Sequence, residues 1–474
     1  MGNIGNIFDG TSTQVLAAVT GTLAAISDGM HYGWTAPVIP ILLSEDSPVK
    51  TTKHQAEWLE TMLMLGAFSG LPTTIYFVDK IGRKYSLLLS SLTTLICWTV
   101  IGVANRIEYI YAARFFSGMA GDMAFVAAPM YIAEIADQKI RGFLSSIIYL
   151  MMLIGIFLIY TVAPFTAFYV PCIIGGALVL VELIVFPFMP ESPYYLLYKD
   201  RPEDAKKALI RFRQTENIEK EFEDISAAVK RQRSERGNPK DLIMVDSNRK
   251  ALLIMTVLNG SQHFSSISVI LMNLHLILEA AGTVYLSSSL AAIIFSIIMF
   301  CAATTASFSI DKFGRKVLLT TSSLLTGCCL LVIAIYFNLK YQGVDVLPVS
   351  WIPIVCIMIY AASFKLGLGM VPIVMTAELF PTKMKAIGMT LADAMYVIFA
   401  IISIELYQLI SDSYGIHVPF YIFSASCFAT ACFTAFVIPE TKGKTLDEIQ
   451  FILKGEKPPP RKDVENEGEK DLFL

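Results

Sequence analysis

Ionisable side chains occur inside several long apolar stretches of this sequence, where they could bind a polar or charged group. The clearest are Lys365, Asp28, Asp122 and Asp393. A charge at the centre of a bilayer costs about 2.5–3.5 kcal/mol, so such residues normally face a cavity and have partners. We expect Lys365 and one or more of the aspartates to line a cavity, where they bind a solute or form an occluding pair. The alternative is a structural ion pair between neighbouring helices, or a side chain that extends to the membrane surface.

Three histidines and one glutamate extend this set: His31, His263, His275 and Glu405. A histidine titrates close to neutral pH, so His31 makes proton coupling an alternative to passive movement of the solute. All eight cysteines lie in apolar stretches without a CxxC pair, which favours buried thiols over metal ligands or disulfides.

The elements that hold these residues are apolar runs long enough to cross a membrane. Of 474 residues, 55% are hydrophobic and only 16% are charged, whereas a soluble domain carries about 25% charged residues. A membrane helix needs about 20 apolar residues and satisfies its backbone internally. The sequence predicts an all-α membrane protein with twelve transmembrane helices, at 15–43, 57–77, 85–104, 109–132, 143–163, 167–188, 251–278, 284–308, 317–338, 351–376, 386–410 and 417–437.

Lysine and arginine gather in alternate loops, and most densely in 189–250. Positive residues favour the cytoplasmic side. The pattern predicts a multi-pass protein of the plasma membrane with both termini and 189–250 in the cytoplasm. We expect an N-terminal six-helix half (1–188), cytoplasmic linker helices (189–250, with helices at 204–214 and 216–236), a C-terminal six-helix half (251–438) and a largely disordered cytoplasmic tail (439–474).

The two halves repeat each other. The segment 79–84, Asp-Lys-Ile-Gly-Arg-Lys, recurs as Asp-Lys-Phe-Gly-Arg-Lys at 311–316, and two shorter motifs recur in the same order. Parallel six-helix repeats place a substrate between the halves, near the bilayer midplane. We expect acids and bases of these motifs to pair between the halves and hold the cytoplasmic side shut; alternatively the bases only set the orientation. The gating candidates are Asp79, Arg83, Glu134, Arg141, Glu191, Asp311, Arg315, Glu378, Lys385 and Glu440.

These motifs, with 129–134 in the fourth helix, Pro-Glu-Ser-Pro at 190–193 and the closing motif at 439–449, resemble the sugar porter family of the major facilitator superfamily. Within it the chain is most similar to the insect facilitated trehalose transporters. The resemblance implies a two-fold repeated carrier that works by alternating access around a central cavity. Proton-coupled members carry an aspartate in the first helix, where this chain has Met30, so we favour facilitated diffusion.

The substrate positions of the family differ here. Its seventh helix reads Gln-Gln-x-x-Gly-x-Asn, and this chain keeps only the first glutamine. The stacking tryptophan of its tenth helix is replaced by Ile373. A site that loses donors to sugar hydroxyls loses selectivity steeply, so membership does not name the substrate. The resemblance and the intramembrane charges together give the substrate-binding candidates Gln262, His263, Ser266, Ser268, Tyr149, Tyr160, Lys365, Pro372, Asp122, Asp393 and Asp28.

The favoured function is therefore movement of a small polar solute, a sugar such as trehalose or glucose, by a chain that acts as a monomer. Two alternatives remain: a proton-coupled or organic-ion carrier of the same fold, and a sugar sensor that does not transport. We find no Walker motif, nucleophile elbow or metal cluster, and expect neither an enzyme, a cofactor nor a nucleic-acid partner.

Overall fold

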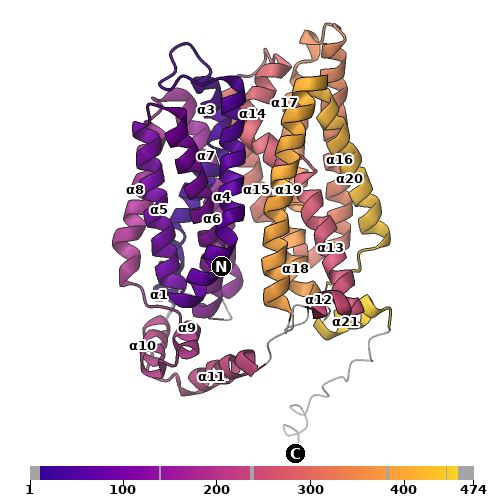
Figure 1. Cartoon of the computed structure of the whole chain (residues 1–474). Helices are drawn as coiled ribbons and strands as arrows, with labels where there is room; N and C mark the ends of the chain where they lie inside the picture. Colours follow the sequence, from indigo (N-terminus) through magenta and orange to yellow (C-terminus); the bar gives the residue numbers. More distant parts are fainter. Residues whose placement is uncertain are drawn as a thin grey trace, which may run out of the picture.

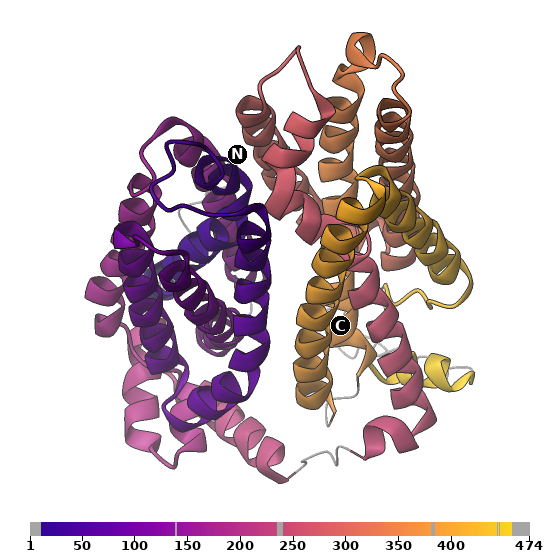
Figure 2. The ribbon, with the colours of Figure 1, turned by 45° about the horizontal axis from the view of Figure 1, so that its top comes forward.

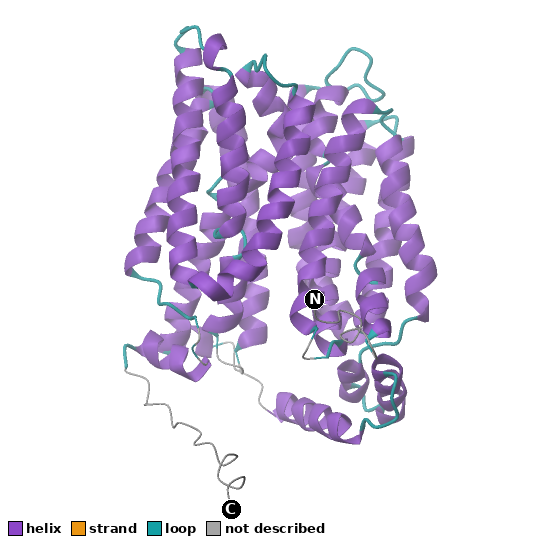
Figure 3. Cartoon of the chain, turned by 180° about the vertical axis from the view of Figure 1, so that it is seen from behind, coloured by secondary structure: helices purple, strands orange, loops and turns teal. Residues whose placement is uncertain are grey.

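The chain forms two groups of long helices joined by short helices at one end, as the computed structural model shows (Figure 1). The structure describes residues 11–137, 140–234, 240–380, 384–442, 444 and 446–456. Within these ranges the chain has helices and loops and no strand (Figure 3). In this described part of the chain, eleven spans are long and apolar enough to cross a membrane. The predicted all-α membrane fold is confirmed.

The first group, called the N half, lies beside the second in Figure 2. Its helices are α1 (Ser12–Thr20), α2 (Leu23–Gly33), α3 (Thr35–Leu42), α4 (Lys53–Lys80), α5 (Arg83–Val103), α6 (Ile107–Ile135), α7 (Arg141–Val162), η2 (Ala163–Phe165), α8 (Val170–Val185) and η3 (Phe186–Phe188). The predicted single helix at 15–43 is wrong in detail, because this stretch is broken into α1, α2 and α3. This stretch is not among the eleven spans.

The second group, called the C half, consists of α13 (Asp246–His263), α14 (Ile267–Ala281), α15 (Ser288–Phe313), α16 (Arg315–Tyr341), η4 (Leu347–Val349), α17 (Trp351–Leu366), α18 (Val371–Leu379), α19 (Lys385–Tyr414) and α20 (His417–Phe436). Two of the predicted spans, 251–278 and 351–376, are each interrupted near their middle. The interruptions separate α13 from α14 and α17 from α18, so unwound backbone lies inside the C half.

The connection between the halves carries α9 (Pro193–Tyr198), α10 (Pro202–Arg213), α11 (Glu219–Ser234) and α12 (Asp241–Met244). The helices predicted at 204–214 and 216–236 correspond to α10 and α11, and α9 and α12 were not expected. The tail was expected to be largely disordered, but it contains α21 (Leu446–Lys454). We call the end of the molecule with α9–α12 and α21 the linker side and the opposite end the distal side (Figure 1).

Glycines bring helices of the N half into backbone contact. A Cβ built on Gly29 of α2 would lie 2.0 Å from the carbonyl oxygen of Met152 in α7, and one on Gly155 would lie 1.9 Å from that of Ile26. The same exchange joins α4 and α6, where a Cβ built on Gly66 or Gly118 would lie 1.9–2.0 Å from a carbonyl oxygen of the other helix. No side chain fits at these contacts, so glycine sets both helix separations.

Candidate functional site

Two interrupted helices of the C half meet near the middle of the molecule. Between α13 and α14, Ser266 adopts a left-handed backbone with φ +73°. Between α17 and α18, Gly367–Met370 is non-helical, and Leu368 lies in this break. The amide nitrogen of Gln262 donates to the Leu368 carbonyl over 2.9 Å, which joins the two breaks. Unwound backbone at membrane depth occurs where it is buried in protein or lines a cavity, and such breaks commonly flank substrate sites.

A group of polar and aromatic side chains lies at this level, and we call Tyr32, His263, Ser268 and Tyr396 the central cluster. The Tyr32 hydroxyl of the N half shares a hydrogen bond of 2.9 Å with Ser268 of the C half. Ser268 is also 2.9 Å from Nδ1 of His263, whose ring centroid lies 4.2 Å from that of Tyr396. Nε2 of His263 is buried without a partner in the described residues. The cluster offers hydroxyls, an imidazole and aromatic rings, which suits a hydroxyl-rich solute.

An aspartate of each half adjoins the central cluster. The Thr74 hydroxyl donates to Asp122 over 2.6 Å, and the Asp122 and Asp393 carboxyl groups are in hydrogen-bonding contact with each other. Tyr149 lies close enough to Asp393 to interact with it electrostatically. Asp393, Tyr149 and Tyr396 are half-buried, so they border space that solvent can enter. The structure thus brings two predicted aspartates together, although as a carboxyl pair and not with a lysine.

Hydrogen bonds join the halves between the central cluster and the distal side. The Asn273 amide donates to buried Glu60 over 3.1 Å, and the Thr61 hydroxyl donates to Glu405 over 2.6 Å. The Tyr160 hydroxyl donates to the Leu271 carbonyl over 2.5 Å. Further contacts of this kind are Thr35 to the Met272 carbonyl, Gln408 to the Glu57 carbonyl and the ion pair of Lys53 with Asp412. These bonds, called the distal contacts, close the interface on that side.

The remaining predicted residues have varied surroundings. Lys365 is half-buried, its ammonium lies 5.8 Å from the Phe364 ring centroid, and it forms no ion pair with the residues that the structure describes. The expected pairing of Lys365 with an aspartate is therefore not found. Asp28 is buried with Oδ2 unpartnered in the described chain, and Ser266 Oγ is likewise unpartnered. Pro372 lies in the first turn of α18, and its carbonyl accepts from Thr376 over 2.8 Å.

The sequence analysis missed several buried polar residues. Glu60 and Glu182 are each 0% exposed, and Asn273 is 7% exposed. Glu182 accepts the Ala24 backbone N–H over 2.5 Å and the Ser91 hydroxyl over 2.9 Å, which fixes α2 and α5 against α8. The positions of both glutamates could have identified them, since they lie inside predicted spans just as Asp28 does. Of the histidines, His31 stacks on Trp98 at 3.8 Å and His275 meets the edge of Tyr160.

The repeated motifs form one ionic cluster in each half on the linker side. Arg83 pairs with Glu134 at 2.9 Å, and Arg315 pairs with Glu378 at 2.9 Å. Asp79 is exposed. The expected pairs between the halves are therefore replaced, among the described side chains, by pairs within each half. The side chains of Arg141, Asp311 and Lys385 lie outside those that the structure describes.

A second carboxylate completes each ionic cluster. Gly82 and Gly314 have φ of +95° and +91°, and a Cβ on them would meet Oε2 of Glu191 at 2.4 Å and of Glu440 at 2.7 Å. Burial raises the pKa of Glu191 to about 7, against the effect of backbone N–H groups of Ser192 and Lys84. At Glu440 burial also acts upward, but donors from Lys442, Arg315 and Lys316 outweigh it and lower the pKa. The glycines are required both for the left-handed turn and for the approach of a carboxylate.

Comparison with known proteins gives the relationship. Residues 13–453 match the family model of the sugar (and other) transporters. The chain is 28% identical over 448 residues to the facilitated trehalose transporter Tret1 of Drosophila virilis, and 28% identical over 442 residues to Tret1 of Bombyx mori. It covers 49% of the fly protein and 87% of the silkworm protein, so it spans about half the length of the fly relative.

Solved structures give the same fold. A partially occluded inward open structure of the xylose transporter XylE from E. coli superposes with a TM-score of 0.75 at 19% identity, and covers 92% of this chain and 100% of that one. XylE bound to 6-bromo-6-deoxy-D-glucose superposes with a TM-score of 0.71 at 20% identity, over 94% of this chain and 100% of that one. At this identity the superposition establishes the major facilitator fold alone. The family match over most of the chain shows that it belongs to the sugar (and other) transporter family.

Proposed function

We propose that this chain moves a sugar of the trehalose or glucose type across the plasma membrane by facilitated diffusion. The names of its relatives support the substrate class, and the hydroxyl, imidazole and aromatic groups of the central cluster support a neutral hydroxylated solute. Carriers of this fold expose one site to the two sides in turn. The chain would act as a monomer, because both halves of its pathway belong to one polypeptide.

The observation that carries the proposal is the position of the distal contacts relative to the central cluster. The contacts made by Asn273, Thr61 and Tyr160 join the halves between the cluster and the distal side. A solute in the cluster would therefore be shut off from the distal side. Half-buried Asp393 and Tyr149 border space that solvent would have to enter from a direction other than the distal side. This supports a site open toward the linker side.

We infer that the linker side is cytoplasmic, because lysine and arginine are concentrated there. Both termini would then be cytoplasmic and the structure would be inward-facing. The division into 1–188, 189–250, 251–438 and 439–474 fits this arrangement. In the outward-facing state the distal contacts would break and the linker-side ionic clusters of the two halves would approach each other.

Uptake of labelled trehalose and glucose by cells that express the chain tests the proposal. Saturable uptake that stops at equal concentrations on both sides, at external pH values near 6 and near 7.5, is the expected result. The test variant is Asn273→Asp, which places a carboxyl group against buried Glu60. It should reduce uptake without loss of protein at the cell surface. Accumulation driven by a pH gradient would contradict facilitated diffusion. Absence of uptake, with the protein verified at the surface, would contradict the sugar assignment and direct attention to charged solutes and Lys365.

A further inference from the structure

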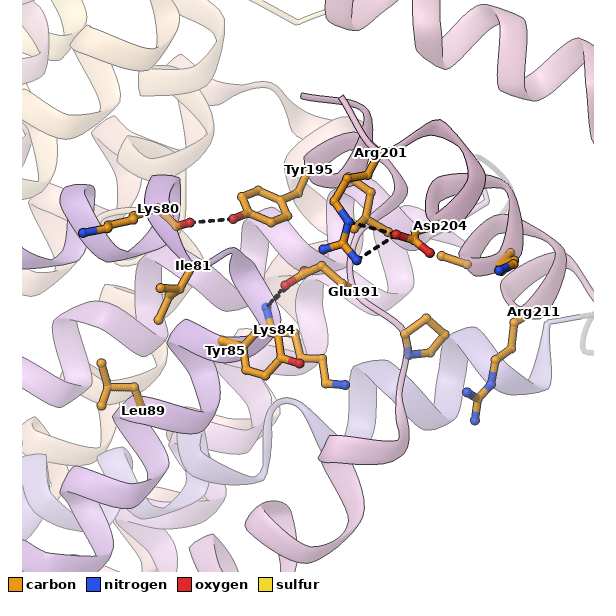
Figure 4. A pocket seen from close by; sticks show the side chains of 14 residues that line it. Lys80, Ile81, Lys84, Tyr85, Leu89, Glu191, Tyr195, Arg201, Asp204 and Arg211 are labelled. Carbon is orange, nitrogen blue, oxygen red and sulfur yellow. Dashed lines mark hydrogen bonds and ion pairs between the residues drawn. The ribbon is translucent and has the colours of Figure 1, made fainter. Parts of the chain in front are cut away.

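A cavity of about 810 Å³ lies on the linker side of the N half (Figure 4). We call it the basic pocket. One wall is the first turns of α5, with Lys84 and Tyr85, and the other is one face of α10. The segment around Glu191 lies between these walls, and its carboxylate accepts the backbone N–H of Lys84 over 3.1 Å. The pocket is therefore formed by parts far apart in the sequence.

The pocket is strongly positive. Five of its lining residues are basic, namely Lys80, Lys84, Arg201, Lys207 and Arg211, and two are acidic, Glu191 and Asp204. Arg201 and Asp204 neutralise each other in an ion pair of 2.7 Å. Burial raises the pKa of Glu191 to about 7, so this group carries only part of a negative charge near neutral pH. A surplus of positive charge remains in the pocket.

Two of these cations, Lys207 and Arg211, have no counter-charge within the part of the chain that the structure describes. They are four residues apart on α10 and so lie on one face of that helix. Neither forms a hydrogen bond or an ion pair with any residue of the described chain, and both are exposed. Lys80 and Lys84 bond only to neutral oxygens, the Tyr76 hydroxyl and the Pro187 carbonyl. Lys207 and Arg211 are therefore pocket cations without an anionic partner among the described residues. Lys84, which interacts electrostatically with Glu191, lies on the opposite wall.

An apolar stripe leads from the pocket along the outside of α5. Tyr85 and Leu89 line the pocket, and Tyr85, Leu92 and Ile96 are 56%, 47% and 55% exposed. Residues at this spacing follow one face of a helix. In a membrane-spanning chain such a face contacts acyl chains. The stripe distinguishes this pocket from a site for a soluble anion, because it joins a positive cavity directly to a lipid-facing surface.

We propose that the basic pocket binds the phosphate-bearing, multiply anionic headgroup of a membrane phospholipid, whose acyl chains lie along Leu89, Leu92 and Ile96. The inference rests on the proposed cytoplasmic position of the linker side, where anionic lipids are concentrated, but not on the identity of the transported solute. Lys207 and Arg211 contact the phosphates from one wall, and Lys84 contacts them from the other. Arginine and lysine are the residues that proteins use for such groups.

Binding of short-chain lipids to the purified full-length protein tests the proposal. The probes are dioctanoyl phosphatidylinositol bisphosphate, dioctanoyl phosphatidylcholine and free inositol trisphosphate. We expect the first to bind in a salt-sensitive way. The Lys207→Gln/Arg211→Gln double variant should bind it about 25-fold more weakly, because each cation near the surface contributes roughly a five-fold factor. The charge-preserving Lys207→Arg/Arg211→Lys variant should bind as the unmodified protein does.

The matched control is Lys220→Gln/Lys230→Gln, which removes the same charge from exposed positions of α11 outside the pocket. Equal loss in this control, or no loss in the Lys207/Arg211 variant, would overturn the assignment to the pocket. Equal affinity for inositol trisphosphate and the lipid would overturn the role of the apolar stripe and identify a soluble anion as the ligand. Sugar uptake is measured in parallel, so that a failure of the transport proposal is seen separately.

Discussion

Asp122 of the N half and Asp393 of the C half hold their carboxyl groups in hydrogen-bonding contact across the interface between the halves. Such a bond requires a proton, since two ionised carboxylates at this distance repel each other. The groups around it are neutral: Thr74, which donates to Asp122, and the phenols of Tyr149 and Tyr396. The pair therefore joins the halves only while at least one of its two carboxyl groups is protonated.

The first prediction concerns this bond. In Asp393→Asn the amide can donate to Asp122 and keep the bond, whereas Asp393→Ala removes it and should reduce the population of the state with the distal side closed. Double electron–electron resonance between labels on the distal residues Glu45 and Ser413, in a cysteine-free background, reports this population. Equal populations in Asp393→Ala and Asp393→Asn would show that the bond does not join the halves in this state.

The distal contacts should contribute measurably to the same equilibrium. Tyr160→Phe removes the hydrogen bond to the Leu271 carbonyl, which is worth about 0.5–1.5 kcal/mol. We expect a shift of roughly 2- to 12-fold away from the distal-closed state in the same resonance experiment. Tyr169→Phe is the control, because Tyr169 is 53% exposed. Equal behaviour of the two variants would show that the bond does not stabilise closure.

His263 should be required for sugar uptake through its hydrogen-bonding capacity. His263→Ala removes one of the two hydrogen-bond partners of Ser268 and the unpartnered Nε2. We expect this to cost about 1–3 kcal/mol, or roughly 5- to 150-fold in kcat/KM. His263→Gln supplies an amide in its place and should recover much of the activity. Initial rates of labelled glucose and trehalose uptake measure both variants. Full activity of the alanine variant would remove His263 from the substrate site.

The two linker-side carboxylates should respond oppositely to pH. The folded-state pKa of Glu191 is raised to about 7, so stability linked to it is present below the ordinary value of 4.5 and is lost as pH rises toward 7. Glu191→Gln should therefore match the unmodified protein in melting temperature near pH 5 and exceed it near pH 8. The pKa of Glu440 is lowered, so Glu440→Gln should be less stable than the unmodified protein near pH 8, with a gap that narrows in acid. Parallel pH profiles for the two variants would contradict this assignment.

The paired glycines should be intolerant of any side chain. Gly118→Ala would place a methyl group 2.0 Å from the Leu63 carbonyl oxygen, so α4 and α6 would have to separate. Gly121→Ala on the same helix is the control, because its methyl group would meet only Asp28 at 3.7 Å. Melting temperature and yield of the purified protein should fall sharply for Gly118→Ala and little for Gly121→Ala.

Much of this architecture was predictable because membrane helices leave a strong apolar signal and the repeated motifs mark equivalent helix ends. The breaks at Phe264–Ser266 and Gly367–Met370 were not predicted, because hydropathy does not report backbone conformation. The aspartates were identified as interior residues, yet their partner was misassigned to Lys365. Hydropathy gives the depth of a residue but not the face of the helix on which it lies, and so cannot decide which intramembrane charges meet.

Two reciprocal glycine contacts also limit how this molecule can move. One joins α2 and α7 through Gly29 and Gly155, and the other joins α4 and α6 through Gly66 and Gly118. If one helix of a pair slid along the other, a carbonyl oxygen would clash with the neighbouring backbone. The two helices of each pair therefore move together as one rigid unit. The moving units of the N half are thus pairs of closely packed helices and not single helices. Bending during a transport cycle is then confined to segments without such backbone contacts. The breaks between α13 and α14 and between α17 and α18 are positions where it can occur.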